Sequence, residues 1–177
     1  MFPTPKPALT PNTYAYESTP LVKPTGFREY DARWLLEKEI NLMGVQALGL
    51  GLGTLIRELK VNPEIVTGHD FRSYSSSVKM ALVSGLMASG CKVYDIGLAI
   101  TPMPYFAQFE LNVPCVAMVT ASHNDNGWTG VKMGANRPLT SGPDEMTRLK
   151  GIVLGAEFKL AGGGSYAFVE NFPARYI

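Results

Sequence analysis

Short apolar segments alternate along this chain with longer segments whose apolar residues recur at helical spacing. Three segments are typical of strands (residues 65–68, 93–96 and 114–120), and two more are short extended pieces (27–33 and 130–133). Four longer segments are typical of helices (37–59, 75–89, 102–111 and 144–153). Strands separated by helices at crossover spacing predict an α/β domain. We therefore expect a three-layer α/β/α sandwich around a mostly parallel, mixed sheet of about four strands.

Length and charge narrow the class of protein. A chain of 177 residues with 46% hydrophobic residues fits one domain with tails and excludes a wholly disordered chain. Sixteen Lys and Arg face fifteen Asp and Glu, a balance that argues against nucleic acid or a membrane surface as the partner. The N-terminus lacks the apolar core of a secretory signal, and no apolar stretch is long and unbroken enough to span a bilayer. We expect a cytoplasmic protein.

Two further motifs have plain structural interpretations. Cys91 and Cys115 lie in apolar runs without metal-ligand spacing, so we expect free, buried thiols. The spacing of Gly49, Gly51 and Gly53 is similar to that of a dinucleotide-binding fingerprint, but that fingerprint follows a strand and opens a helix. Here the glycines lie inside a helical pattern, and we expect them to let this helix pack closely against the sheet.

Proline and glycine mark the ends of the folded region. Six of the thirteen prolines fall in the first 24 residues, so residues 1–25 are expected to form an extended arm without helix or regular sheet pairing. Tyr14, Tyr16 and Leu21 would drape this arm over the domain. A glycine-rich stretch near residue 162 precedes an apolar run at the C-terminus. We expect residues 26–158 to form the domain, and residues 159–177 to be a linker and the truncated start of a second domain.

Polar loops follow two of the predicted strands, at residues 68–75 and 120–124. In parallel sheets, ligands bind beside the carboxyl ends of the strands. Ser122 could hold a phosphate ester, and cationic and amide side chains converging on it would make an anion site. The candidates for that site are His123, Asn124, Lys132, Arg33 and Arg72. A hydrolase pair of Ser122 with His123 is disfavoured, because adjacent side chains of an extended segment point apart and no GxSxG elbow is present.

The segment Thr-Ala-Ser-His-Asn at residues 120–124 resembles the phosphoserine signature of the α-D-phosphohexomutase family. Residues 27–33 (Phe-Arg-Glu-Tyr-Asp-Ala-Arg), 68–73 (Gly-His-Asp-Phe-Arg-Ser) and 101–107 (Thr-Pro-Met-Pro-Tyr-Phe-Ala) resemble three further family motifs, in the same order. The residues in these motifs are similar to those of the phosphomannomutase/phosphoglucomutase branch of the family. The resemblance implies that this chain is the N-terminal domain, domain I, of such an enzyme.

The resemblance also implies roles for single residues. Ser122 would be the phosphoserine that donates the phosphoryl group, and its phosphate would help to hold Mg²⁺, whose other ligands would come from the second domain. Lys132 and Arg33 would assist proton transfer with a sugar hydroxyl. The remaining candidates would flank the serine or lie beside the substrate: His123, Asn124 and Tyr30. Arg72 is expected to be structural, paired with acidic neighbours, and His69 is expected to be structural as well.

The implied reaction interconverts hexose 6-phosphate and hexose 1-phosphate, of mannose or glucose, through a hexose 1,6-bisphosphate. Family members have four domains, so the implied partners are the phosphosugar and domains II–IV of the same chain, and residues 1–177 alone are not expected to turn over. The sequence departs from the family where Asp125 and Asn126 follow Asn124, a place that usually holds proline, and where Thr129 replaces the usual asparagine. These departures leave an alternative, a non-catalytic phosphosugar-binding or assembly domain in which Ser122 is not phosphorylated.

Overall fold

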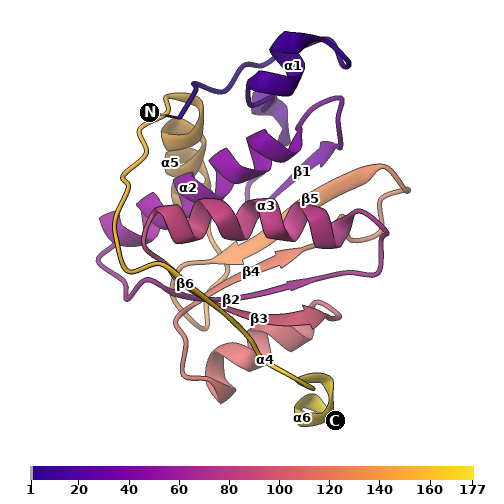
Figure 1. The fold of residues 1–177 in the computed structure, drawn as a ribbon. Coiled ribbons are helices and arrows are strands. Elements are labelled where there is room, and N and C mark those ends of the chain that lie inside the picture. The colour runs from indigo at the N-terminus through magenta and orange to yellow at the C-terminus, as the bar shows by residue number, and fades with distance from the viewer. Residues whose placement is uncertain (1) are drawn as a thin grey trace.

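One mixed sheet lies between helices in the computed structural model, which describes residues 2–177 (Figure 1). Its strands are β1 (Asp31–Leu35), β2 (Glu64–His69), β3 (Lys92–Leu98), β4 (Cys115–Val119), β5 (Trp128–Gly134) and β6 (Ser165–Phe168). Its helices are α1 (Tyr14–Ser18), α2 (Leu42–Glu58), α3 (Ser75–Ala88), α4 (Pro102–Glu110), α5 (Pro143–Leu154) and α6 (Pro173–Tyr176), with a 3₁₀ turn at Pro24–Gly26.

The strands are ordered β1-β5-β4-β2-β3-β6 across the sheet. Strands β4, β2, β3 and β6 run parallel, whereas β5 is antiparallel to both β4 and β1. The predicted α/β sandwich with a mostly parallel, mixed sheet is confirmed, but the sheet has six strands rather than about four. Strand β6 falls in the apolar C-terminal run that was expected to begin a second domain, whereas the structure pairs it with β3 at the edge of this sheet.

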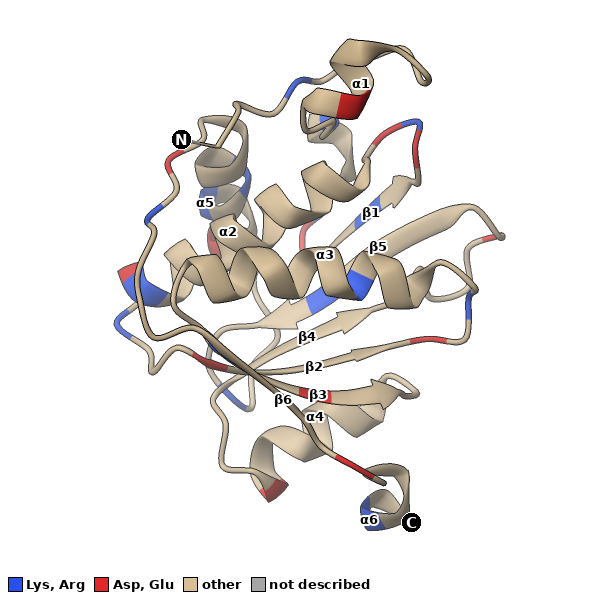
Figure 2. Cartoon of the chain, viewed as in Figure 1, with Lys and Arg blue, Asp and Glu red and all other residues tan. Residues whose placement is uncertain are grey.

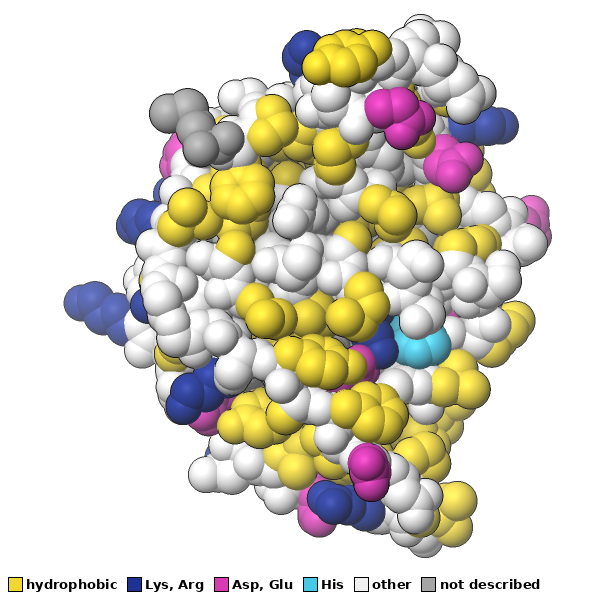
Figure 3. Space-filling view, in the orientation of Figure 1, with side chains coloured by type: hydrophobic (Ala, Val, Ile, Leu, Met, Phe, Trp, Pro, Cys, Tyr) yellow, Lys and Arg dark blue, Asp and Glu magenta, His cyan; other side chains and the backbone are white. Residues whose placement is uncertain are grey.

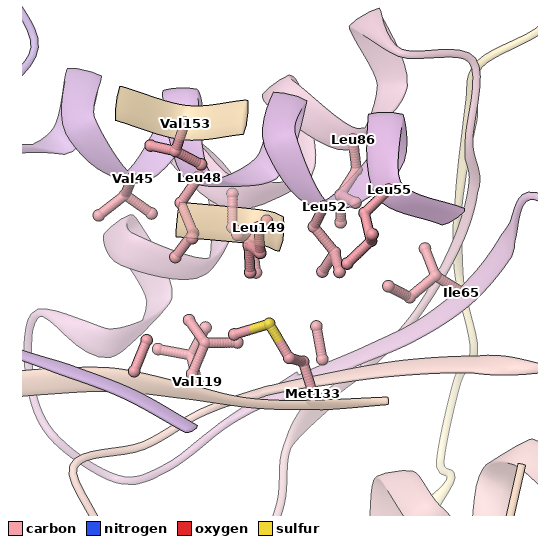
Figure 4. Close-up of a cluster of buried hydrophobic side chains, with 14 of the residues drawn as sticks. Val45, Leu48, Leu52, Leu55, Ile65, Leu86, Val119, Met133, Leu149 and Val153 are labelled. Carbon is pink, nitrogen blue, oxygen red and sulfur yellow. The ribbon is translucent and has the colours of Figure 1, made fainter. Parts of the chain in front are cut away.

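The two faces of the sheet carry different helices. Helices α2, α3 and α5 cover one face, and α4 covers the other (Figure 1). Figure 4 shows the larger core, in which Leu48 and Leu52 of α2 face Val119 of β4 and Met133 of β5. Strand β4 is buried along its whole length, as its unbroken apolar sequence predicts for a strand covered on both faces. The carboxyl end of β4, where Ser122 follows, is thus fixed by packing on both sides.

Glycines let the helices of the larger layer approach closely. A Cβ at Gly49 of α2 would lie 2.2 Å from the carbonyl oxygen of Leu82 in α3, and a Cβ at Gly85 of α3 would lie 2.1 Å from that of Gln46. A Cβ at Gly51 would meet Val153 of α5 at 2.4 Å. The expectation of close packing is confirmed, but the expectation that the glycines pack against the sheet was wrong. They face other helices, because leucines occupy the sheet-facing positions of α2.

The N-terminal arm is more ordered than its prolines predict. Between Pro11 and Pro20 lies a proline-free stretch, and it forms the short helix α1, in which the Oγ1 of Thr13 accepts from the backbone N–H of Tyr16 at 3.3 Å. The expectation of no helix was therefore wrong here. Leu21 anchors the arm with 1% of its surface exposed, whereas Tyr14 is 88% exposed and anchors nothing.

The C-terminal segment packs against the same sheet. Strand β6 pairs in parallel with β3, and Phe172 beyond it is fully buried in the smaller core below the sheet, beside residues of α4 such as Ala107. The Oη of Tyr166 donates to the Oδ2 of Asp95 in β3 at 2.7 Å. Residues 165–172 therefore contribute both an edge strand and a core side chain to this domain.

Candidate active site

Ser122 lies in the turn that joins β4 to the antiparallel strand β5, just beyond the carboxyl end of β4. It is exposed, and its backbone has φ of 56°, in the left-handed region that residues other than glycine rarely adopt. Its N–H donates to the Oγ1 of Thr120 at 3.0 Å. The turn thus presents the Ser122 hydroxyl to solvent at the edge where α/β sheets bind ligands.

His123 lies closer to Ser122 than expected. The Oγ of Ser122 is 3.4 Å from the Nδ1 of His123, so the expectation that these side chains point apart was wrong. The reason is the left-handed backbone at Ser122, which removes the alternation of an extended segment. Within residues 2–177 no carboxylate bonds to the His123 ring, so the third member that a hydrolytic triad needs to orient its base is missing there.

Arg33 and Asn124 come together although 91 positions separate them. Arg33 lies on β1, opposite Gly130 of β5, and its Nη1 donates to the Oδ1 of Asn124 at 2.8 Å. Its Nε and Nη2 both donate to the Oδ2 of Asp31, at 2.9 and 2.7 Å. The antiparallel pairing of β1 with β5 therefore brings a paired guanidinium to the side of the Ser122 turn.

The remaining candidates line two adjoining cavities. Ser122 and His123 line a cavity of about 760 Å³, while Lys132 and Tyr30 line a smaller one of about 300 Å³. Thr101, which precedes α4, borders both cavities. No hydrogen bond between Lys132 and Ser122 is present in the described part of the chain, and Lys132 lies within β5, opposite Met118 of β4. Figure 2 shows basic positions on strands β1 and β5.

Arg72 does more than its sequence position indicates. Its guanidinium pairs with the carboxylate of Asp70, which confirms the predicted pairing with an acidic neighbour. Its Nη2 also donates to the carbonyl oxygens of Asn124, at 2.6 Å, and of Ser122, at 3.4 Å. Sequence reasoning missed these contacts with the turn; the only local signal was the spacing of Asp70 and Arg72, two residues apart.

Asp70 remains a carboxylate because its hydrogen bonds outweigh its burial. Burial alone would raise its pKa, but hydrogen bonds from Ser75, Thr120 and the backbone N–H of Arg72, with the nearby guanidinium charge, hold the pKa below the usual range. The Oγ of Ser75 lies 2.5 Å from the Oδ1 of Asp70. A charged Asp70 is the state that pairs with Arg72.

Tyr74 holds the far side of the turn. Its Oη accepts from the N–H of Gly127 and donates to the carbonyl of Trp128, both at 2.8 Å. This contact was also missed, because it joins residues more than fifty positions apart. The loop after β2 therefore supplies two side chains, Arg72 and Tyr74, that fix the turn carrying Ser122.

The other residues singled out in the sequence, His69, Cys91 and Cys115, are structural. The Nδ1 of His69 lies 2.8 Å from the carbonyl oxygen of Asp70, within the same loop. Cys91 and Cys115 are free and buried, as predicted, and burial raises the pKa of the Cys115 thiol to about 12.

Residues 2–177 contain no group of three or more His, Cys, Asp or Glu that could hold a metal ion. Nor does any helix described there have the length and apolar character needed to cross a membrane.

Comparisons with known proteins agree on one family. A family model described as phosphoglucomutase/phosphomannomutase, alpha/beta/alpha domain I, matches residues 24–159. A probable phosphoglucosamine mutase of Pyrococcus furiosus is 40% identical over 112 residues, which are 63% of this chain and 24% of that protein. A phosphomannomutase of Escherichia coli is 41% identical over 109 residues, 62% of this chain and 23% of that protein.

Solved structures show the same likeness. The crystal structure of a phosphoglucomutase/phosphomannomutase family protein from Burkholderia thailandensis matches with a TM-score of 0.79 at 27% identity, covering 88% of this chain and 35% of that one. The chain thus spans about a quarter of the length of the two curated relatives (24% and 23%) and about a third of the solved one (35%).

The matched region contains strands β1–β5 and every side chain described around Ser122. Sequence and fold were compared separately, and both comparisons reach the same group of proteins through most of this chain. The chain belongs to the phosphoglucomutase/phosphomannomutase family, of which it carries domain I.

Proposed function

We propose that this chain is the phosphoserine domain of a phosphohexomutase, in which Ser122 carries the phosphoryl group that moves between the 1- and 6-positions of a hexose. The observation that carries the proposal is the placement of Ser122. Its hydroxyl is exposed at the carboxyl edge of a family domain I, in a turn held by three side chains from two other segments (Arg33, Arg72 and Tyr74). A fixed, accessible hydroxyl beside cationic groups suits transfer of a charged group.

The neighbouring residues have complementary roles. Lys132 lines the cavity next to that of Ser122 together with Tyr30, so it is placed to bind an anionic or hydroxyl group of a substrate. Arg33 contributes to the positive charge at the site while holding the side chain of Asn124. His123, 3.4 Å from the Ser122 hydroxyl, flanks the transferring group. With Lys132, Arg33 assists proton transfer at the sugar hydroxyl.

The substrate class is a hexose phosphate, and the intermediate and activator is a hexose 1,6-bisphosphate. The relatives' names support the class without choosing the sugar, since one is named for glucosamine phosphate and the other for mannose phosphate. The sequences of residues 27–33 and 120–124 resemble the phosphomannomutase/phosphoglucomutase branch, which favours mannose phosphate or glucose phosphate as the substrate. The site lies at the sheet edge of a chain with no membrane-crossing helix among residues 2–177, and we propose a cytoplasmic enzyme.

Magnesium would reach this domain only through the phosphate on Ser122. The one buried carboxylate beside the turn, that of Asp70, is committed to Arg72 and Ser75. The side chains of residues 2–177 do not make a metal site by themselves. When bound, Mg²⁺ would offset the charge of the transferring group, and its remaining ligands would come from another domain.

The rest of the enzyme would be domains II–IV of the same chain, and the isolated domain would not turn over. Support comes from the lengths of the relatives and from apolar side chains around the larger cavity: Phe71 is 83% exposed, Leu98 59% and Ile100 58%. Figure 3 shows hydrophobic side chains gathered on the surface over β6. We propose residues 26–158 as domain I, residues 1–25 as its arm, and residues 159–177 as the linker into domain II, a linker that lies along the edge of the domain I sheet through β6 and Phe172.

The test is an intact-mass measurement on the full-length protein after incubation with hexose 1,6-bisphosphate, for the wild type and for Ser122→Ala. We expect one phosphate adduct in the wild type and none in the variant, together with mutase turnover only in the wild type. Ser165→Ala, an exposed serine on β6, is the matched control and should keep the adduct. A wild type that never gains the adduct would favour the non-catalytic alternative, a domain that binds phosphosugars or mediates assembly.

A further inference from the structure

A guanidinium bridges two loops beside Ser122. Arg72 follows β2, and its Nη2 donates to the backbone carbonyl of Asn124 at 2.6 Å and to that of Ser122 at 3.4 Å. Its Nη1 pairs with Asp70. The side chains of Arg72 and Asp70 are only 8% and 10% exposed, so this bridge lies under the turn and not on the open surface.

The bridge is anchored on a helix. The Oδ1 of Asp70 accepts from the Oγ of Ser75 at 2.5 Å and from the N–H of Arg72 at 3.2 Å. Ser75 is buried and is the first residue of α3, a helix packed against α2 along its length. Helix α3 thus holds Asp70, Asp70 holds Arg72, and Arg72 holds the backbone of the Ser122 turn. Asp70 and Arg72 are oppositely charged and fix each other's geometry.

The geometry argues against Arg72 as a phosphate ligand. Its charge is already paired with Asp70, and its donors point at backbone carbonyls. Both Arg72 and Lys132 line a cavity at the site, but within the described residues Lys132 has no ion pair, whereas Arg72 is paired with Asp70. An arginine neutralised in this way fixes backbone, whereas a lysine without a partner can meet an incoming anion.

The turn also requires such support. A left-handed backbone at a serine persists only where the surroundings hold it. The carbonyls of Ser122 and Asn124 bracket the reactive residue and its neighbour, so holding both carbonyls fixes the backbone position from which the Ser122 side chain projects. Phosphoryl transfer depends on positioning, and a displacement of about 1 Å can lower a rate by roughly 100-fold.

We propose that Arg72 is a positioning residue for phosphoryl transfer, acting through the backbone of the Ser122 turn with Asp70 as its anchor. The inference rests on the function proposed above, in which Ser122 carries the phosphoryl group. It gives the loop after β2 a role in catalysis that is exerted through the backbone of the Ser122 turn and assigns neither Arg72 nor Asp70 a contact with the substrate.

The test compares Arg72→Gln and Arg72→Lys with the matched control Arg57→Gln in the full-length protein. Arg57 makes the same kind of contact at the other end of α3, donating to the carbonyls of Ser89 at 2.7 Å and Gly90 at 3.4 Å. The measurements are kcat and KM for the mutase reaction, and hydrogen exchange of the amides at residues 121–127 in the same proteins.

For Arg72→Gln we expect kcat to fall roughly 10- to 100-fold, with KM within about twofold of the wild type, and faster exchange at residues 121–127. Arg72→Lys should recover part of kcat, because an ammonium keeps the pair with Asp70 but cannot fork to two carbonyls. Arg57→Gln should leave kcat and the exchange of residues 121–127 unchanged, even where it lowers the melting temperature as much as Arg72→Gln does.

Three results would overturn the inference. One is an unchanged kcat in Arg72→Gln. Another is a raised KM with unchanged kcat, which would make Arg72 a substrate ligand. The third is exchange at residues 121–127 that does not respond to either Arg72 variant. If Arg72→Gln does not fold, Arg72→Lys alone decides, since the inference requires it to exchange faster than the wild type at the turn. A wild type without phosphoserine or turnover would reject the proposed function instead, while hydrogen exchange would still report whether Arg72 holds the turn.

Discussion

At Ser122 the backbone has a conformation that glycine adopts freely and that other residues avoid. Replacing the serine by either alanine or glycine removes the hydroxyl that accepts phosphate, so neither variant should gain the adduct. We expect Ser122→Gly to be about 1 kcal/mol more stable to unfolding than Ser122→Ala, because only the alanine keeps the steric penalty at φ of 56°. Denaturant unfolding of the two variants measures the difference.

The control for this comparison is Ser84, an exposed serine within α3. In a helix the order reverses, and Ser84→Ala should be more stable than Ser84→Gly by about 1 kcal/mol. If Ser122→Ala matched Ser122→Gly in stability, the left-handed conformation would not be the one that the folded protein holds in solution.

Single residues also show how far the sequence could predict the site. The family motifs selected Ser122, Asn124 and Arg33, and the structure joins the last two by a hydrogen bond. The contacts of Arg72 and Tyr74 with the turn could not be predicted, because they involve backbone atoms fifty or more positions away. Backbone carbonyls and amides are the same in every sequence, so only the fold shows which of them face a given side chain.

Among the elements, the crossing of α2 and α3 depends on glycine at the contact. A Cβ at Gly85 would lie 2.1 Å from the carbonyl oxygen of Gln46 and 2.7 Å from the nitrogen of Leu50, so the two helices would have to separate. We expect Gly85→Ala to lower the free energy of unfolding by about 2 to 3 kcal/mol through overpacking, despite the better helix propensity of alanine. Thermal or denaturant unfolding measures this loss.

Gly151 in α5 provides the matched control. A Cβ there would meet only the end of the Arg148 side chain, at 3.8 Å. Gly151→Ala should therefore raise the free energy of unfolding by about 0.5 to 1 kcal/mol, as expected for alanine at an open helix position. The two substitutions should therefore change the free energy of unfolding in opposite directions, whereas a neutral Gly85→Ala would show that the helix crossing can relax.

The elements that could be predicted are those with a strong period or a buried run. Strand β4 has an unbroken apolar sequence, and its predicted range (114–120) contains the observed one (Cys115–Val119). Helix α2 was expected from residue 37 but begins at Leu42, because the Oδ1 of Asn41 accepts from the N–H of Gly44 at 2.8 Å and caps it there. Apolar residues before the cap continued the pattern, and only hydrogen bonding shows where the helix starts.

For the whole molecule, a buried charge cluster joins helix α3 to two strands of the sheet, β3 and β6. The carboxylate of Asp95 on β3 is 2.5 Å from the ammonium of Lys79 on α3, and their side chains are 1% and 5% exposed. The same carboxylate accepts from the N–H of Gly97 at 2.8 Å and from the Oη of Tyr166 on β6 at 2.7 Å. Its hydrogen bonds are therefore shared between the core helix and the C-terminal edge strand. Loss of one partner would weaken the attachment of β6.

The contact of Tyr166 with Asp95 makes this attachment sensitive to high pH. Burial, together with the hydrogen bond to Asp95 and its charge, raises the pKa of Tyr166 to about 12. A raised pKa means that the protonated phenol is favoured in the folded state, so its stabilisation is complete below the ordinary pKa near 10. That stabilisation is lost as pH rises from about 10 to about 12.

We therefore expect Tyr166→Phe to be less stable than the wild type at pH 7, with a difference that shrinks between pH of about 10 and about 12. Denaturant unfolding across this range measures the difference, and hydrogen exchange at residues 165–169 locates it on β6. The control is Tyr14→Phe, since the side chain of Tyr14 is 88% exposed. A difference between Tyr166→Phe and the wild type that stays constant with pH would mean that the phenol does not donate to Asp95. Edge pairing with β3 and the burial of Phe172 would then hold the C-terminal segment on the sheet by themselves.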